Sequence, residues 1–224
     1  METVMDDPAF LGATLVVIDF ETLTPAGRSP EPVEVAAIAG RFTPIGTWQQ
    51  TGRFQALMQP PDDVPVTCFD RAQTGLTARE LARHPPAAEV MAALDARLTR
   101  PPYRLVAHSA HTEATVIAGQ RQHCPVLAAT SLLCTVKLSR AAFPELASHR
   151  LDAVLRFLGI PVPADRHRAM PDTELTVQVL QAALAEGRER RLWATLRDLD
   201  AAAGIAPRPA ANRAGNAQAP EPLF

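Results

Sequence analysis

The chain has 224 residues, of which 47% are hydrophobic and 21% are charged, and its formal net charge is −2. These values fit one globular domain with an ordinary core, and they exclude a strongly basic protein that coats nucleic acid through bulk charge. They allow an enzyme that holds a phosphate chain through metal ions and a few local arginines. The three cysteines are odd in number and form no Cys-x-x-Cys pair, which indicates reduced thiols in a cytoplasmic protein.

Three regions follow from the composition along the chain. Residues 1–13 are an acidic N-terminal extension without the basic start and apolar centre of a signal peptide. Residues 14–204 form the folded domain, and residues 205–224, rich in Ala, Pro and Arg, are expected to be a disordered tail. Because no apolar stretch reaches membrane-spanning length, we expect no membrane partner.

The most informative stretch is an apolar run, Leu15 to Ile18, that ends in Asp19-Phe20-Glu21. Such a run predicts a strand buried on both faces at the centre of an α/β sheet. Side chains alternate along a strand, so Asp19 and Glu21 point to the same side. Two adjacent carboxylates repel each other, and a divalent cation between them would remove that cost. The alternative is that the strand simply ends there and both acids face solvent.

The remaining elements predict a mixed sheet with helices on its faces. Strands over 32–42 and 48–58 form an antiparallel three-stranded meander with the first strand, and a further strand covers 103–108. A helix starts after Thr77, with Glu80 as its capping partner. We expect further helices at residues 87–98, 110–122, 150–158, 171–187 and 188–203, and a strand-to-helix passage within 130–142.

Two later segments carry further acids. Glu113 lies in the first turn of a predicted helix, and Asp172 lies beside Pro171 at another helix start, shortly after His167. Each has an ordinary structural explanation, because acids favour the positive end of a helix dipole and a histidine is common in loops. Taken together with Asp19 and Glu21, they supply four carboxylates and one imidazole.

Six segments of the chain recur together in one known family. They are Asp19-Phe20-Glu21-Thr22, Val33-Glu34-Val35-Ala36-Ala37-Ile38, Thr74-Gly75-Leu76-Thr77, Val106-Ala107-His108-Ser109-Ala110, His149-Arg150-Leu151-Asp152 with Leu158-Gly159-Ile160, and His167-Arg168-Ala169-Met170-Pro171-Asp172. In this order and spacing they resemble the DEDD-type 3′-to-5′ exonucleases, in the branch that has a catalytic histidine. That branch includes the proofreading subunit of bacterial replicative DNA polymerase and ribonuclease T.

The resemblance implies a fold, a cofactor and a set of roles. The fold would be α/β and ribonuclease H-like, and residues 14–204 would be the exonuclease domain. Two Mg²⁺ or Mn²⁺ ions would be held by the four acids, and His167 would be the general base that takes a proton from the attacking water. The substrate would be the 3′ end of single-stranded DNA or RNA. Further residues would contact the terminal nucleotide: Thr22, Leu76, His108 and Ser109.

The chain departs from the family at the second acidic motif. The family has Phe-Asp where this chain has Thr112-Glu113, and the longer glutamate moves its carboxylate by roughly 1.5 Å. We expect an active enzyme, and the alternative is a catalytically weak module that binds nucleic acid or a DNA polymerase. The tail could tether the domain to a polymerase partner, or it could be an ordinary disordered end. DNA and RNA remain equally open as substrates.

Overall fold

The computed structural model describes residues 2–163 and 167–208, and it is built around one six-stranded sheet. The strands, in spatial order, are β3 (Trp48–Leu57), β2 (Glu31–Phe42), β1 (Thr14–Leu23), β4 (Tyr103–Ala107), β5 (Leu132–Cys134) and β6 (Gly204–Ile205). The first three strands form the expected antiparallel meander. β4 is parallel to β1 and β5 is parallel to β4, while β6 is antiparallel to β5. The predicted mixed sheet is therefore confirmed.

β1 lies at the centre of the sheet, and its side chains alternate between two hydrophobic cores. Leu15 and Val17 face the first core, which is formed with helices on one side of the sheet. Val16 and Ile18 face the second core on the other side. This alternation explains why the sequence of β1 is apolar without a break up to Asp19, since both faces of the strand are covered.

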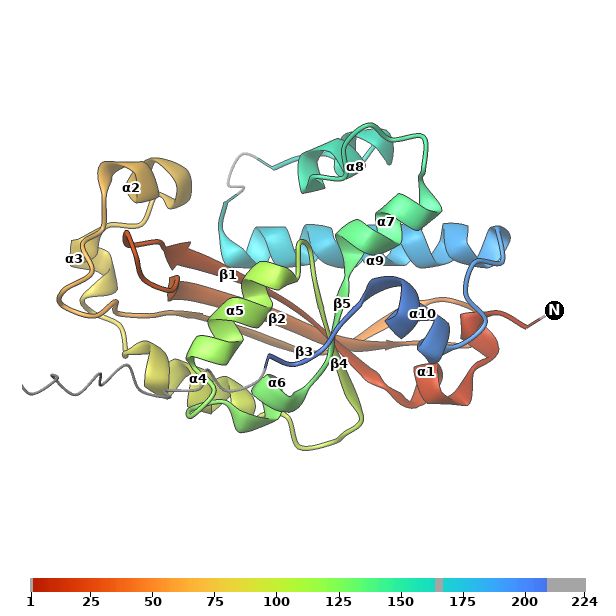
Figure 1. The fold of residues 1–224 in the computed structure, drawn as a ribbon, viewed down its shortest axis with the longest axis horizontal. Coiled ribbons are helices and arrows are strands. Elements are labelled where there is room, and N and C mark those ends of the chain that lie inside the picture. Colours follow the sequence, from red (N-terminus) through yellow and green to blue (C-terminus); the bar gives the residue numbers. More distant parts are fainter. Residues whose placement is uncertain (1, 164–166, 209–224) are drawn as a thin grey trace, which may run out of the picture.

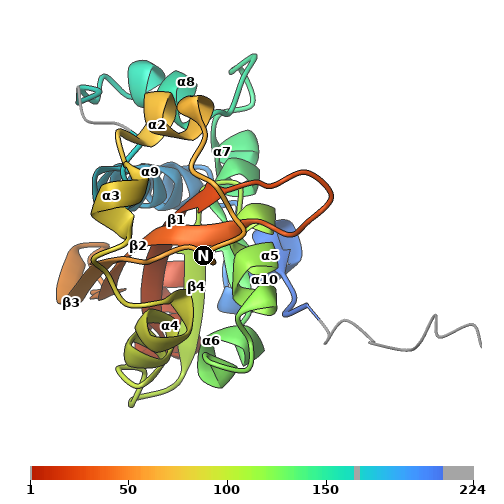
Figure 2. The ribbon, with the colours of Figure 1, turned by 90° about the vertical axis from the view of Figure 1, so that its left-hand side faces the viewer.

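Helices cover both faces of the sheet (Figure 1). One face packs against α1 (Pro8–Gly12), α7 (Thr135–Ala142), α9 (Ala169–Glu189) and α10 (Leu196–Ala203). The other face packs against α4 (Ala87–Asp95), α5 (His111–Gly119) and α6 (Pro125–Ala129). α8 (Leu151–Phe157) packs on the outer side of α9, opposite α4 and α6 in the turned view of Figure 2. α2 (Cys68–Thr74) and α3 (Ala78–Leu81) extend beyond the C-terminal end of β1.

Most expected helices are present, and the differences have local causes. α2 and α6 were not predicted, although Thr67 and Asp70 form a reciprocal capping box that marks the start of α2. The prediction of one helix over 188–203 is wrong in its first half. α9 continues to Glu189, Arg191 adopts a left-handed φ of 55°, and α10 begins only after the Thr195 cap.

Both ends of the described chain contribute to the core. The 3-10 helix η1 (Val4–Asp6) and α1 bring Val4, Met5 and Phe10 into the first core. Ile205 pairs with β5 as part of β6, so the expected domain boundary at 204 falls inside a strand. The rest of the expected tail beyond residue 208 lies outside the described residues. Within the described ranges, no helix has both the length and the hydrophobicity that a membrane span requires.

Candidate active site

The site is built on the C-terminal half of β1. Asp19 lies opposite Ala36 and Glu21 lies opposite Glu34 in the antiparallel pairing with β2. The pairing register shifts between Glu21 and Thr22, which is a common way to redirect side chains at the end of a strand. Since residues 15, 17, 19 and 21 share one side of the strand, Asp19 and Glu21 face the side of the sheet that α9 covers.

The third acid comes from the first turn of α9. Asp172 is buried, with 7% of its surface exposed, and one carboxylate oxygen from each of Asp19, Glu21 and Asp172 lies within 4.8 Å of the other two. Two segments that are about 150 residues apart in the sequence therefore meet in one acidic cluster. The structure thus brings together three of the four acids that the sequence singled out.

The electrostatics of this cluster favour a bound cation. The pKa of Asp19 is raised well above its usual range, chiefly because the carboxyl is removed from water, and also by the neighbouring charges of Glu113, Glu21 and Asp172. Three carboxylates at this spacing supply the hard oxygen ligands that Mg²⁺ and Mn²⁺ prefer. A divalent cation would offset both the burial and the mutual repulsion. The donor set therefore fits a divalent metal site.

Glu113 lies beside this cluster but outside the group of three. It is the third residue of α5, and only 4% of its surface is exposed. Burial raises the pKa of Glu113 to about 8, and the charge of Glu21 acts in the same direction. Its Oε2 atom has no hydrogen-bond partner among the residues that the structure describes. A buried carboxylate oxygen without a donor is costly, and a cation is one way to compensate it.

His167 lies at the edge of the same site. Its side chain is exposed, and its backbone adopts a left-handed φ of 70°. Together with Asp19 and Asp172 it lines a cleft of about 1050 Å³. A non-glycine residue in this conformation costs roughly 1–3 kcal/mol, and such residues concentrate at functional sites.

His108 and Ser109, which follow β4, also line this cleft. His108 Nδ1 lies 2.9 Å from Thr135 Oγ1, and its Nε2 lies 3.0 Å from the carbonyl oxygen of His149. Since that carbonyl can only accept, Nε2 donates, and the ring joins the end of β4 to the loop before α8. Ser109 is exposed in the cleft with a left-handed φ of 65°.

The other two residues expected to contact a nucleotide differ from each other. Thr22 is half-buried next to Glu21, close to the acids. Leu76 is 2% exposed and belongs to a separate hydrophobic cluster with Leu23, Val33 and others. A contact between the Leu76 side chain and a nucleotide would therefore need this segment to open.

Sequence reasoning did not give a role to several residues at the site. Arg140, His149 and Arg150 line the cleft, and neither arginine forms an ion pair with a described residue. Glu34, inside an apolar strand pattern, is fully buried and binds Arg168. A charged residue within an otherwise apolar strand was the available signal, because charged side chains are almost never fully buried unless they are paired.

The family model described as Exonuclease (RNase_T) matches residues 16–180, which include every acid of the site and His167. The chain belongs to this exonuclease family. Its members are nucleases, which hydrolyse phosphodiester bonds, and the fold described above is the ribonuclease H-like fold of solved exonucleases.

Solved structures and curated relatives agree with this membership. The nuclease domain of 3′hExo, a DEDDh family member bound to rAMP, has a TM-score of 0.67 at 18% identity, covering 81% of this chain and 95% of that one. Exonuclease I of E. coli in complex with a dT13 oligonucleotide has a TM-score of 0.67 at 21% identity, covering 80% of this chain and 42% of that one.

Among curated proteins, the exonuclease domain is 28% identical over 181 residues to a PolC-type DNA polymerase III of Bacillus cereus, covering 79% of this chain. The corresponding polymerase of Caldanaerobacter subterraneus subsp. tengcongensis is 22% identical over 184 residues, covering 82% of this chain. This chain spans only 12% of the length of either polymerase.

Proposed function

We propose that the protein is a 3′-to-5′ exonuclease that removes nucleotides from single-stranded DNA or RNA with the help of two Mg²⁺ or Mn²⁺ ions. The observation that carries this proposal is the cluster of Asp19, Glu21 and Asp172, whose oxygens lie within 4.8 Å of one another. Two of these acids, Asp19 and Asp172, line a cleft of about 1050 Å³ together with His167. The matched exonuclease family supplies the reaction class.

Each residue has a role in this proposal. Asp19, Glu21, Glu113 and Asp172 hold the metal ions through carboxylate oxygens. When bound, the ions supply an activated water and stabilise the negative charge that develops on the phosphate and on the leaving 3′ oxygen. His167 accepts the proton of the attacking water at a ring nitrogen, since a neutral imidazole has one ring nitrogen free to accept a proton. Thr22, His108 and Ser109 contact the terminal nucleotide, and the buried Leu76 joins them only when its segment opens.

The polymer and its context are part of the proposal. The solved neighbours hold rAMP in one case and a dT13 oligonucleotide in another, so both sugars are kept as candidates. Similarity to a segment of two PolC-type DNA polymerases supports a role beside a polymerase, with a DNA 3′ end as substrate.

The alternative is a weakly catalytic module that binds a nucleic-acid 3′ end or a polymerase partner. One observation favours it: the three-acid group that the described residues form does not include Glu113. If the fourth acid fails to reach the second ion, binding could persist while hydrolysis is slow.

A time course on a 5′-labelled single-stranded oligonucleotide separates the two possibilities. DNA and RNA versions are incubated with Mg²⁺, with Mn²⁺ or with EDTA. We expect a metal-dependent ladder that shortens from the 3′ end, and a loss of about 100-fold or more in Asp19→Asn and in His167→Ala. Asp62→Asn and His123→Ala, which alter side chains outside the cleft, serve as matched controls and should retain activity.

Retained binding of the oligonucleotide without a ladder under either metal would favour the binding module. A ladder that persists in EDTA would contradict the metal-dependent mechanism.

A further inference from the structure

Glu34 is a charged side chain at the interior of the protein. It lies in β2, directly opposite Glu21 of β1, and 0% of its surface is exposed. A lone buried carboxylate is expensive, so this residue must be compensated by hydrogen bonds and an opposite charge.

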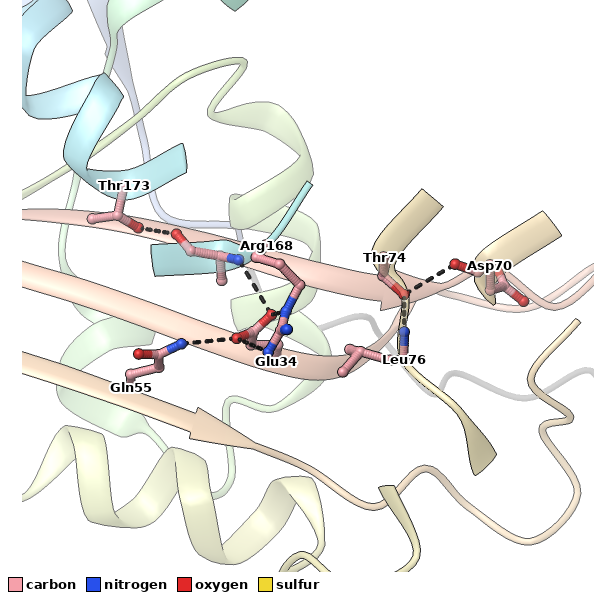
Figure 3. Close-up of polar contacts among 8 residues, drawn as sticks. Glu34, Gln55, Asp70, Thr74, Leu76, Arg168 and Thr173 are labelled. Carbon is pink, nitrogen blue, oxygen red and sulfur yellow. Dashed lines mark hydrogen bonds and ion pairs between the residues drawn. The ribbon is translucent and has the colours of Figure 1, made fainter. Parts of the chain in front are cut away.

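Arg168 provides that compensation in a two-pronged ion pair (Figure 3). Arg168 Nε donates to Glu34 Oε2 at 2.8 Å, and Arg168 Nη2 donates to Oε1 at 3.1 Å. Gln55 Nε2 donates to Oε1 at 3.0 Å, and the backbone N–H of Ala169 donates to Oε2 at 3.2 Å. Burial acts to raise the pKa of Glu34, but these hydrogen bonds outweigh it and the pKa is lowered, so the carboxylate is charged at neutral pH.

The partners of Glu34 are adjacent to the site in the chain. Arg168 follows His167 and is the N-cap residue of α9, while Ala169 is the first residue of that helix. Arg168 makes no side-chain cap of its own, so the Glu34 carboxylate accepts one of the N–H groups that the helix start leaves unpaired. One turn further along the helix, the Thr173 hydroxyl donates to the Ala169 carbonyl at 2.6 Å.

From this arrangement we infer that Glu34 and Arg168 are positioning residues for the reaction: they fix His167 and the first turn of α9, which carries Asp172, to the strand beside the metal-binding strand. His167 adopts a left-handed φ, a conformation that surrounding contacts must maintain. Arg168 is the next residue in the chain, and its ion pair with Glu34 is one such contact on the C-terminal side of His167. The inference rests on the proposed function, because it assigns an effect on the proton transfer proposed for His167.

Position matters here because general bases act over hydrogen-bond distances. A displacement of about 1 Å in a catalytic group can cost on the order of 100-fold in rate. The Glu34–Arg168 ion pair, called the clamp from here on, also places a positive charge beside the acids. The Arg168 guanidinium binds Glu34 and interacts electrostatically with Glu21. A lysine at position 168 would keep that charge but could not make the two parallel hydrogen bonds of the guanidinium to Glu34.

Two variants and a matched control test the inference by steady-state kinetics on a single-stranded oligonucleotide. Glu34→Gln removes the negative charge of the carboxylate but keeps the shape of the side chain. Arg168→Lys keeps the positive charge but removes the paired hydrogen bonds of the guanidinium. We expect each to lower kcat about 10- to 100-fold while KM changes less than about threefold. Glu174→Gln removes another bridge from the sheet to α9, Arg53 Nη1 to Glu174 Oε1 at 2.6 Å, and should leave kcat within about twofold of wild type.

A purely structural role is separated from positioning by a double-mutant comparison. If the clamp acts through His167, His167→Ala will cost much less in the Glu34→Gln protein than in wild type. If kcat per folded molecule is unchanged in both clamp variants, or if the cost of His167→Ala is the same in both backgrounds, the inference is wrong. An equal loss in Glu174→Gln would also overturn it, since any loosening of α9 would then suffice.

Hydrogen exchange gives a readout that does not depend on activity. The Ala169 amide should exchange about tenfold faster in Glu34→Gln than in wild type, and Glu174→Gln should leave it unchanged. Unchanged exchange would refute the clamp. If the wild-type protein has no nuclease activity, but Ala169 still exchanges faster in Glu34→Gln than in wild type, the proposed function is refuted and the clamp remains.

Discussion

The metal-free protein should lose stability as the pH rises, and Glu113 should be a major cause. Its ordinary pKa is 4.5, and burial raises the pKa to about 8 in the folded protein. A group whose pKa is raised by folding stabilises the protein fully below the unfolded value and loses that contribution as the pH rises through the folded value. The loss therefore begins near pH 4.5 and levels off above about pH 9.

The magnitude follows from the two pKa values. One pKa unit corresponds to about 1.4 kcal/mol, so the full loss is at most about 5 kcal/mol, of which about 3 kcal/mol falls between about pH 5.5 and 8.5. For a protein of this size, about 3 kcal/mol lowers Tm by roughly 6–12 °C. Bound cations would offset the same charge, so Mn²⁺ should reduce this loss.

Thermal unfolding in EDTA, measured across this pH range, tests the reasoning. Glu113→Gln removes the charge and should unfold at an increasingly higher temperature than wild type as the pH rises. Glu89→Gln is the matched control, because Glu89 is also the third residue of its helix, α4, but is exposed. Parallel Tm curves for wild type and Glu113→Gln would refute the proposed burial of a titrating carboxyl at this position.

Three further outcomes are expected. Gly187→Ala places a methyl group 2.2 Å from the indole ring beside it and should destabilise the protein by about 1–3 kcal/mol in urea unfolding, whereas Gly119→Ala, with nothing within 4 Å, should stabilise it by up to about 1 kcal/mol. Thiol titration of the native protein should label one cysteine rapidly, Cys68, since the other two are buried; rapid labelling in Cys68→Ser would contradict this. Replacing Arg140 and Arg150 by Gln should reduce the salt dependence of oligonucleotide binding by about 0.7 per arginine that contacts a phosphate, and an unchanged slope would exclude such contacts.

The sequence alone determined the local elements that depend on short-range patterns. The unbroken apolar run before Asp19 predicted a strand covered on both faces, and β1 has that environment because its side chains alternate between two cores. The order of the motifs predicted the acids from β1 and α9, because Asp19 and Glu21 follow an unbroken apolar run in one strand and Asp172 lies in the first turn of a helix. Where local signals were mixed, the prediction failed: residues 188–195 are helix-compatible in composition but contain the turn at Arg191.

Only the tertiary structure decided how these pieces act together. Glu34 reads as one charged residue in a strand, and its bond to a residue 134 positions away depends on α9 crossing the sheet at that point. Glu113 reads as a helix-dipole partner, and its burial beside Asp19 depends on how α5 packs against the neighbouring strands. Local sequence specifies backbone conformation through nearest neighbours, whereas burial, pKa and charge pairing are set by groups that only folding brings within a few ångströms of one another.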